Sequence, residues 1–114
     1  MNNQLEEILL SLNIGNSNFF QYMEERTHSY RLGAKDFGWG VFPQVDNAGI
    51  LIDIRMCVPN VVDEATLLIN IHEYYHAFEL FNELGSIYIE DRENREARAR
   101  QAENTYLSRI KPIK

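Results

Sequence analysis

Apolar residues near the start of the chain recur at helical spacing. Residues 3–12 carry them three or four positions apart, on one helical face: Leu5, Ile8, Leu9 and Leu12. Turn-forming residues at Asn13–Ser17 end this helix. A second helix, capped by Asn16 or Ser17, is expected to run to about Arg31. Its inward positions are the apolar ones: Phe19, Phe20 and Met23.

The middle of the chain changes to the period of strands. After a break at Gly33–Asp36, the aromatic and glycine-punctuated run Phe37–Phe42 predicts a strand, and Pro43 confines it to a sheet edge or a strand end. Turn residues at Asp46–Gly49 lead into a second strand, Ile50–Val58. An antiparallel hairpin is the simplest product. Alternation places five side chains of the second strand on one face: Ile50, Ile52, Ile54, Met56 and Val58.

Two longer helices follow the predicted hairpin. Asn60 or Asp63 can cap the first of them, which is expected to end near Leu84, before Gly85. The second, rich in charge, covers Asp91–Lys111. Its apolar positions recur at helical spacing: Ala99, Ala102, Tyr106, Leu107 and Ile110.

Length and composition fit one folded domain, residues 1–114. The chain is 45% hydrophobic and 25% charged, which is typical of a globular protein. Together with the pattern above, this predicts an α+β fold: a small antiparallel sheet packed on the longer helices, with two helices before it. The net charge of −6 argues against nucleic acid as a partner. No apolar run approaches the roughly 20 residues that a membrane helix needs.

Cys57 is the only cysteine, so the chain has no internal disulfide framework, and a cytoplasmic location is expected. This cysteine lies in an apolar, strand-like run and is expected to pack in the interior rather than to react. The oligomeric state is left open by the sequence.

The first long helix contains His72-Glu73-Tyr74-Tyr75-His76. Two histidines four positions apart project from one helical face, one turn from each other, as two zinc ligands must. Glu73 lies beside the metal in this pattern and can take a proton from metal-bound water. His-Glu-x-x-His is the signature of zinc-dependent peptidases.

Catalytic zinc needs a third protein ligand besides a water. No histidine or cysteine follows His76, so the candidates are carboxylates: Glu79, Glu83, Glu90, Asp91, Glu93, Glu96 and Glu103. Glu79 and Glu83 share the helix of the histidines and do not easily converge on the same metal. At about 100° per residue, Glu96 borders the buried stripe of the last helix, whereas Glu93 lies farther toward solvent. Glu96 is the predicted third ligand.

A competing interpretation places Glu96 in an ordinary surface ion pair with Arg100, four positions later. In that case Glu96 would not reach the metal. Small residues on the same face, Ala99 and Ala102, favour a close approach of the two helices and therefore a role for Glu96 in the site. Glu103 lies on this face too, two turns farther along.

The spacing of His72, His76 and Glu96 resembles the gluzincin clan of metallopeptidases, and the order of elements in so short a chain resembles its smallest members, the minigluzincins. The resemblance implies that these three residues bind zinc and that Glu73 polarises the bound water. It also implies that Ile50–Val58 is the strand that pairs with an extended substrate. Family members of this size are latent, with a terminal segment in the cleft; Ser108–Lys114 would have that part here.

The chain departs from the family pattern at Arg100, where many gluzincins carry an aspartate that orients a histidine. A backbone carbonyl, Asp53 or Glu103 would have to supply that contact. The run Glu96-Ala97-x-Ala99 instead resembles the repressor-cleaving phage and stress-response metallopeptidases, which are the second possible relatives.

These features predict a zinc-dependent peptidase that hydrolyses peptides or unstructured protein segments, with Glu73 as general base and zinc as cofactor. The oxyanion of the reaction needs a donor besides the metal, for which Tyr88, Tyr106 and His28 are candidates. Alternatives are a zinc-binding regulatory or interaction protein that cleaves nothing, and a helical scaffold whose histidines pack at an interface.

Overall fold

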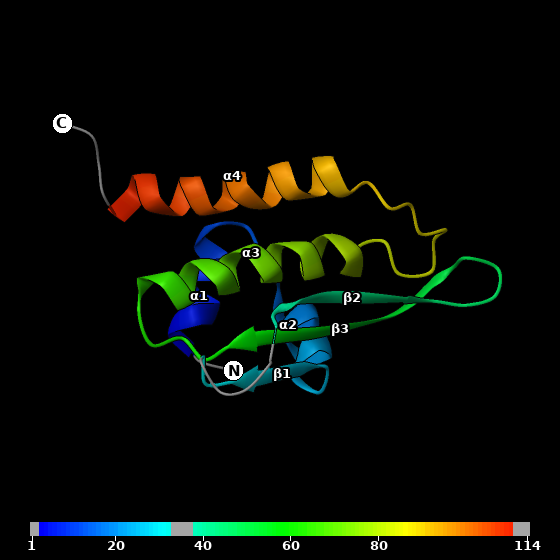
Figure 1. Cartoon of the computed structure of the whole chain (residues 1–114), viewed down its shortest axis with the longest axis horizontal. Helices are drawn as coiled ribbons and strands as arrows, with labels where there is room; N and C mark the ends of the chain where they lie inside the picture. The colour runs from blue at the N-terminus through cyan, green and yellow to red at the C-terminus, as the bar shows by residue number, and fades with distance from the viewer. Residues whose placement is uncertain (1–2, 33–37, 111–114) are drawn as a thin grey trace.

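Four helices and a three-stranded sheet make up the part of the chain that the computed structural model describes, residues 3–32 and 38–110 (Figure 1). The elements are α1 (Asn3–Ser11), α2 (Ser17–Glu24), β1 (Thr27–Tyr30), β2 (Gly40–Val45), β3 (Leu51–Pro59), α3 (Glu64–Phe81) and α4 (Arg92–Ile110). The predicted α+β class is confirmed. The break expected at Gly33–Asp36, the strand residue Phe37 and residues 111–114 lie outside the described residues.

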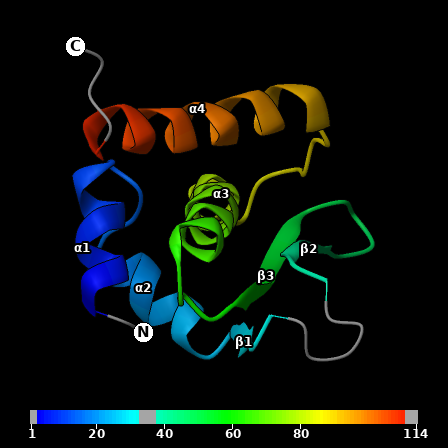
Figure 2. The same cartoon turned by 60° about the vertical axis from the view of Figure 1, so that its left-hand side comes forward.

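Helix α3 lies at the centre of the fold, between the sheet and α4, with α1 and α2 along its side (Figure 2). It is enclosed because it is apolar on most of its circumference, as a helix packed on several sides must be. Its buried side chains include Leu67, Ile71, Tyr74, Ala77 and Leu80. Asp63 is its N-cap, as expected, and forms a reciprocal capping box with Thr66.

The N-terminal helices bury their predicted apolar faces, but α2 ends at Glu24 rather than near Arg31. Thr27–Tyr30 instead forms β1, which pairs in parallel with β3. Thr27–Tyr30 continues the helical spacing of α2, so the local pattern alone favours a helix. In a strand, however, the backbone groups of these residues can pair with those on the side of β3 that β2 leaves unpaired, which a helix would not do. His28 consequently lies on an exposed strand position.

Strand order in the sheet is β1-β3-β2, with β2 antiparallel to β3 as predicted and β1 parallel to it, so the sheet is mixed rather than antiparallel. Strand β2 begins at Gly40 and runs through Pro43, which lies on an edge strand as the sequence indicated. The expected alternation of β3 holds only in part. Gln44 of β2 is opposite Asp53 of β3, but the next residue of β2, Val45, is opposite Leu51. Ile52 therefore has no partner in β2, and it is 57% exposed.

Helix α4 packs along α3 through a narrow stripe of three buried residues: Arg95, Ala99 and Ala102. The two alanines bring the backbones of α3 and α4 close together, while most of the charged side chains of α4 face solvent. Among the described residues, no helix combines the length and the apolar character required to cross a membrane.

Candidate metal centre

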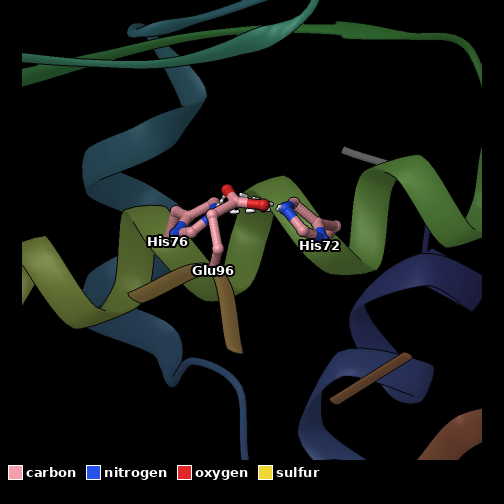
Figure 3. A group of neighbouring side chains, drawn as sticks. All are labelled: His72, His76 and Glu96. Atoms are coloured by element: carbon pink, nitrogen blue, oxygen red, sulfur yellow. Dashed lines mark hydrogen bonds and ion pairs between the residues drawn. The ribbon is translucent and has the colours of Figure 1, made fainter. Parts of the chain in front are cut away.

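Two helices bring three potential metal ligands together. His72 and His76 extend from one face of α3, and the carboxylate of Glu96 reaches between them from α4 (Figure 3). Oε1 of Glu96 lies 2.8 Å from Nε2 of His76 and 3.2 Å from Nε2 of His72, and the two Nε2 atoms are 3.1 Å apart. Glu96 therefore faces the histidines, as its place on the helical stripe predicted.

The spacing of these atoms suits a small metal ion. Bonds of roughly 2.0–2.1 Å at tetrahedral angles put neighbouring ligand atoms about 3.3 Å apart. The three observed separations, 2.8–3.2 Å, are slightly shorter than this, as expected of side chains that hydrogen-bond to one another. Two imidazoles and one carboxylate are also the donor set of a common class of catalytic zinc sites. These residues fit the ion.

The competing ion pair of Glu96 is weak. Nη2 of Arg100 lies 3.9 Å from Oε2 of Glu96, and the Arg100 side chain is 70% exposed. An exposed pair at this distance contributes little. Burial by itself would raise the pKa of the Glu96 carboxyl. The hydrogen bonds with His72 and His76 outweigh this effect and lower the pKa below its ordinary value.

Arg95 positions the helix that carries Glu96. Its guanidinium donates one hydrogen bond of 2.8 Å to Glu79 of α3 and two, of 2.9 Å and 3.0 Å, to Glu83 just after α3. A fourth, of 2.9 Å, goes to the carbonyl of Ile89. Two of the carboxylates considered as ligands, Glu79 and Glu83, are thus engaged by this arginine. This role of Arg95 was not predicted from the sequence, although its spacing from Ala99 and Ala102 places it on the buried stripe.

Glu73 is buried beside the ligands, with Oε2 4.0 Å from Nε2 of His72. Burial, reinforced by the negative charges of Glu96 and Glu103, raises the pKa of Glu73 to about 7, while His72 acts in the opposite direction. A carboxyl with a pKa near neutrality can accept and return a proton during a reaction at pH 7. The geometry therefore places a carboxyl suited to proton transfer next to the three potential ligands.

Glu103 supplies a partner for the other ring nitrogen of His72. Its Oε2 lies 2.6 Å from Nδ1. Burial lowers the pKa of the His72 imidazole, but the hydrogen bonds to Glu103 and Glu96 outweigh this and raise it overall. Glu103 thus provides the carboxylate contact to a histidine that Arg100 cannot supply. Asp53, the other side chain considered for this contact, instead forms ion pairs with Arg26 and Arg55. His76 lacks such a second carboxylate contact in the described residues, and burial lowers its pKa.

A cleft of about 570 Å³ opens beside the ligands. Glu73, His76 and Glu96 line one side, and residues 39–43 of β2 and its approach line another. Tyr88 also lines this cleft. Of the other two candidate oxyanion donors, Tyr106 packs against the core and His28 borders a separate hollow next to Cys57, which is half-buried in β3.

The strand predicted to pair with substrate, Ile50–Val58, corresponds to β3, the middle strand of the sheet. Its residues 51–57 pair with β2 on one side and its residues 56–59 pair with β1 on the other. The free edge nearest the ligands belongs to β2. Of the segment expected to fill the cleft, residues 108–110 form the last turn of α4, where Arg109 donates to the carbonyl of Ser11; the rest is outside the described residues.

Comparison of the chain with protein-family models, with curated proteins and with solved structures gave no match.

Proposed function

We propose that this protein is a zinc-dependent peptidase that hydrolyses peptides or unstructured protein segments. The convergence of His72, His76 and Glu96 within 3.2 Å of one another, next to an open cleft, is the observation that carries the proposal. Zinc, when bound, supplies a Lewis acid that polarises a peptide carbonyl and makes water nucleophilic near neutral pH. A cytoplasmic location is part of the proposal, because a chain with one cysteine needs no oxidising compartment.

The side chains around the ligands have separate roles in this proposal. Glu73 accepts the proton of the attacking water and returns it to the leaving amine, which its raised pKa allows. Glu103 fixes the orientation of the His72 ring. Tyr88 lines the cleft, and its hydroxyl is the proposed second donor to the oxyanion. The free edge of β2 holds the substrate in an extended conformation.

Metal analysis and proteolysis test the proposal together. The purified wild-type protein should contain about one zinc per chain and should cleave casein, an unstructured protein. His72→Ala should lose both the zinc and the activity, whereas Glu73→Gln should keep the zinc and lose activity. His28→Ala is the matched control, since His28 lies outside the cleft.

Three outcomes distinguish the possibilities. Zinc binding with activity that disappears in Glu73→Gln supports the peptidase. Zinc binding without any cleavage would favour a regulatory or interaction protein. Failure of the wild-type protein to retain zinc after dialysis in chelator-free buffer would contradict the proposed metal site itself.

A further inference from the structure

The backbone of β3 shows which groups of the sheet are already paired. The N–H of Met56 donates a 3.0 Å hydrogen bond to the carbonyl of Arg26, immediately before β1. Backbone groups of successive residues in a strand point to opposite sides, so those of Met56 face β1. Those of its two neighbours, Arg55 and Cys57, must then face β2.

The register carries this orientation over to β2. Arg55 is opposite Phe42 and Cys57 is opposite Gly40, so Phe42 and Gly40 hydrogen-bond to β3. By the same alternation, the backbone groups of Val41 and Pro43 point away from β3, toward the free edge that borders the cleft. Val41 presents both an N–H and a carbonyl there. Pro43 presents only a carbonyl, because proline has no N–H.

We propose that Pro43 restricts peptide binding to a short extended stretch, anchored at the residue that pairs with Val41. This inference rests on the proposed peptidase function and specifies its substrates. An extended peptide beside β2 meets an outward-facing residue every second position, or about every 6.8 Å. At Val41 it exchanges two hydrogen bonds. At Pro43 the peptide N–H can still donate to the proline carbonyl, but the peptide carbonyl meets no donor, so longer peptides gain little from reaching this position.

The consequence is a length preference. A substrate needs a few flexible residues around the bond to be cleaved, and residues on the Pro43 side add little affinity. This suits loops, termini and short peptides better than long strands. Proline on an edge strand also hinders pairing between protein molecules, so a purely protective role of Pro43 is the competing explanation.

Binding to the Pro43→Ala variant tests the proposal. Trp39, the only tryptophan of the chain, lines the cleft and reports peptide binding by its fluorescence. The probes are nested peptides of roughly four and roughly eight residues, taken from a casein segment that the wild-type protein cleaves. Binding is measured in the Glu73→Gln background, so that no probe is hydrolysed.

With Pro43 present, the long and short peptides should bind within about twofold of each other. Pro43→Ala adds one donor to the edge and should tighten binding of the long peptide by roughly 2- to 10-fold, with no change for the short one. Gln44→Ala is the control, because the backbone of Gln44 faces Asp53 of β3; it should alter neither affinity.

Equal affinity of both peptides for Pro43→Ala would overturn the inference. So would a variant that merely self-associates in size-exclusion chromatography without a length-dependent gain in peptide affinity. Failure of the proposed function looks different: the zinc-loaded wild-type protein would then cleave no casein at all. Cleavage by the wild-type protein, with no effect of Pro43→Ala on length dependence, would remove this inference alone.

Discussion

Glu103 places a carboxylate oxygen 2.6 Å from Nδ1 of His72, while Nε2 of the same ring faces Glu96. A carboxylate at this position accepts a hydrogen bond from Nδ1, which leaves the lone pair of Nε2 for a metal. Glu103 follows Glu96 by seven positions, two turns along α4, so both carboxylates lie on the same face. The two glutamates thus contact His72 from opposite sides of its ring.

Removal of the Glu103 carboxylate should weaken zinc binding without abolishing it. Outer contacts of this kind are worth about 10–100-fold in metal affinity. Competition with a chromophoric chelator should therefore show a loss of this size in Glu103→Ala and a smaller one in Glu103→Gln, whose amide oxygen still accepts. The exposed Glu93 provides the control, Glu93→Ala. An unchanged affinity of Glu103→Ala would mean that the contact orients nothing.

Glu73 should destabilise the metal-free protein at neutral and alkaline pH. Its pKa rises from 4.5 to about 7 on folding, so the folded state disfavours the charged form. The penalty is absent below about pH 4.5, grows between the two pKa values and is complete above about pH 7. Glu73→Gln should raise the free energy of unfolding at pH 8 by about 1–3 kcal/mol.

Thermal melts of chelator-treated protein test this at two pH values. Wild type and Glu73→Gln should melt alike near pH 4.5 and differ by several degrees at pH 8, with the variant higher. A variant that melts lower than wild type at pH 8 would show that Glu73 stabilises the fold. A buried base that lowers the stability of the fold is typical of reactive sites.

Arg95 should contribute far more to stability than its neighbour Arg98, although both pair with Glu79. The Arg95 side chain is 11% exposed and also binds Glu83, whereas that of Arg98 is 45% exposed. Loss of one partner from a buried pair leaves uncompensated charge, so Arg95→Ala should cost about 2–4 kcal/mol. Arg98→Ala should cost at most about 1 kcal/mol.

Urea unfolding of the two variants makes the comparison. Zinc affinity should fall in Arg95→Ala as well, because Glu96 is the next residue and the same helix turn holds both. Equal losses in Arg95→Ala and Arg98→Ala would contradict the special role of Arg95 in joining α4 to α3.

Much of the candidate site could be predicted from local patterns because each potential ligand lies on a regular helix. The four-residue spacing of His72 and His76 fixes their common face, and the apolar period of α4 indicates that Glu96 borders the buried stripe. Asp63 could likewise be predicted as a cap from its chemistry. These features depend on residues within one or two helical turns.

The features that could not be predicted depend on contacts distant in sequence. Thr27 lies opposite Met56, and only the presence of β3 makes residues 27–30 a strand. The bulge at Ile52 depends on how β2 and β3 meet across the turn, which strict alternation along one strand does not reveal. Arg95 is one of many charges on α4, and its burial depends on Glu79 and Glu83 of another segment.

Gly15 should tolerate no side chain. Its φ is +100°, and a Cβ would lie 2.7 Å from the ring of Phe20 and 2.9 Å from that of Phe19, which is fully buried. Gly15→Ala combines backbone strain with overpacking and should cost about 2–4 kcal/mol. Gly49 has a similar φ of +82° but open space around it, so Gly49→Ala should cost only about 1 kcal/mol. Similar losses in urea unfolding would rule out the clash.

Asp53 should stabilise the protein in a pH-dependent way. Burial favours its neutral form, but hydrogen bonds from Arg26 and Tyr22 outweigh this and hold its pKa at about 2, below the ordinary 3.8. A carboxyl with a depressed folded-state pKa contributes stability that is fully present above the unfolded value and lost as pH falls through the folded one. The window is therefore about pH 4 down to pH 2.

The Asp53→Asn variant isolates this contribution from that of the other acidic residues. At pH 6 it should be less stable than wild type by about 1–2 kcal/mol, since solvent screens the partly exposed Arg26. The difference in free energy of unfolding should shrink toward zero between about pH 4 and pH 2, because wild-type Asp53 becomes protonated there. Glu7→Gln, at an exposed position of α1, should show no such convergence. A constant difference across this range would mean that Asp53 acts through packing rather than through its charge.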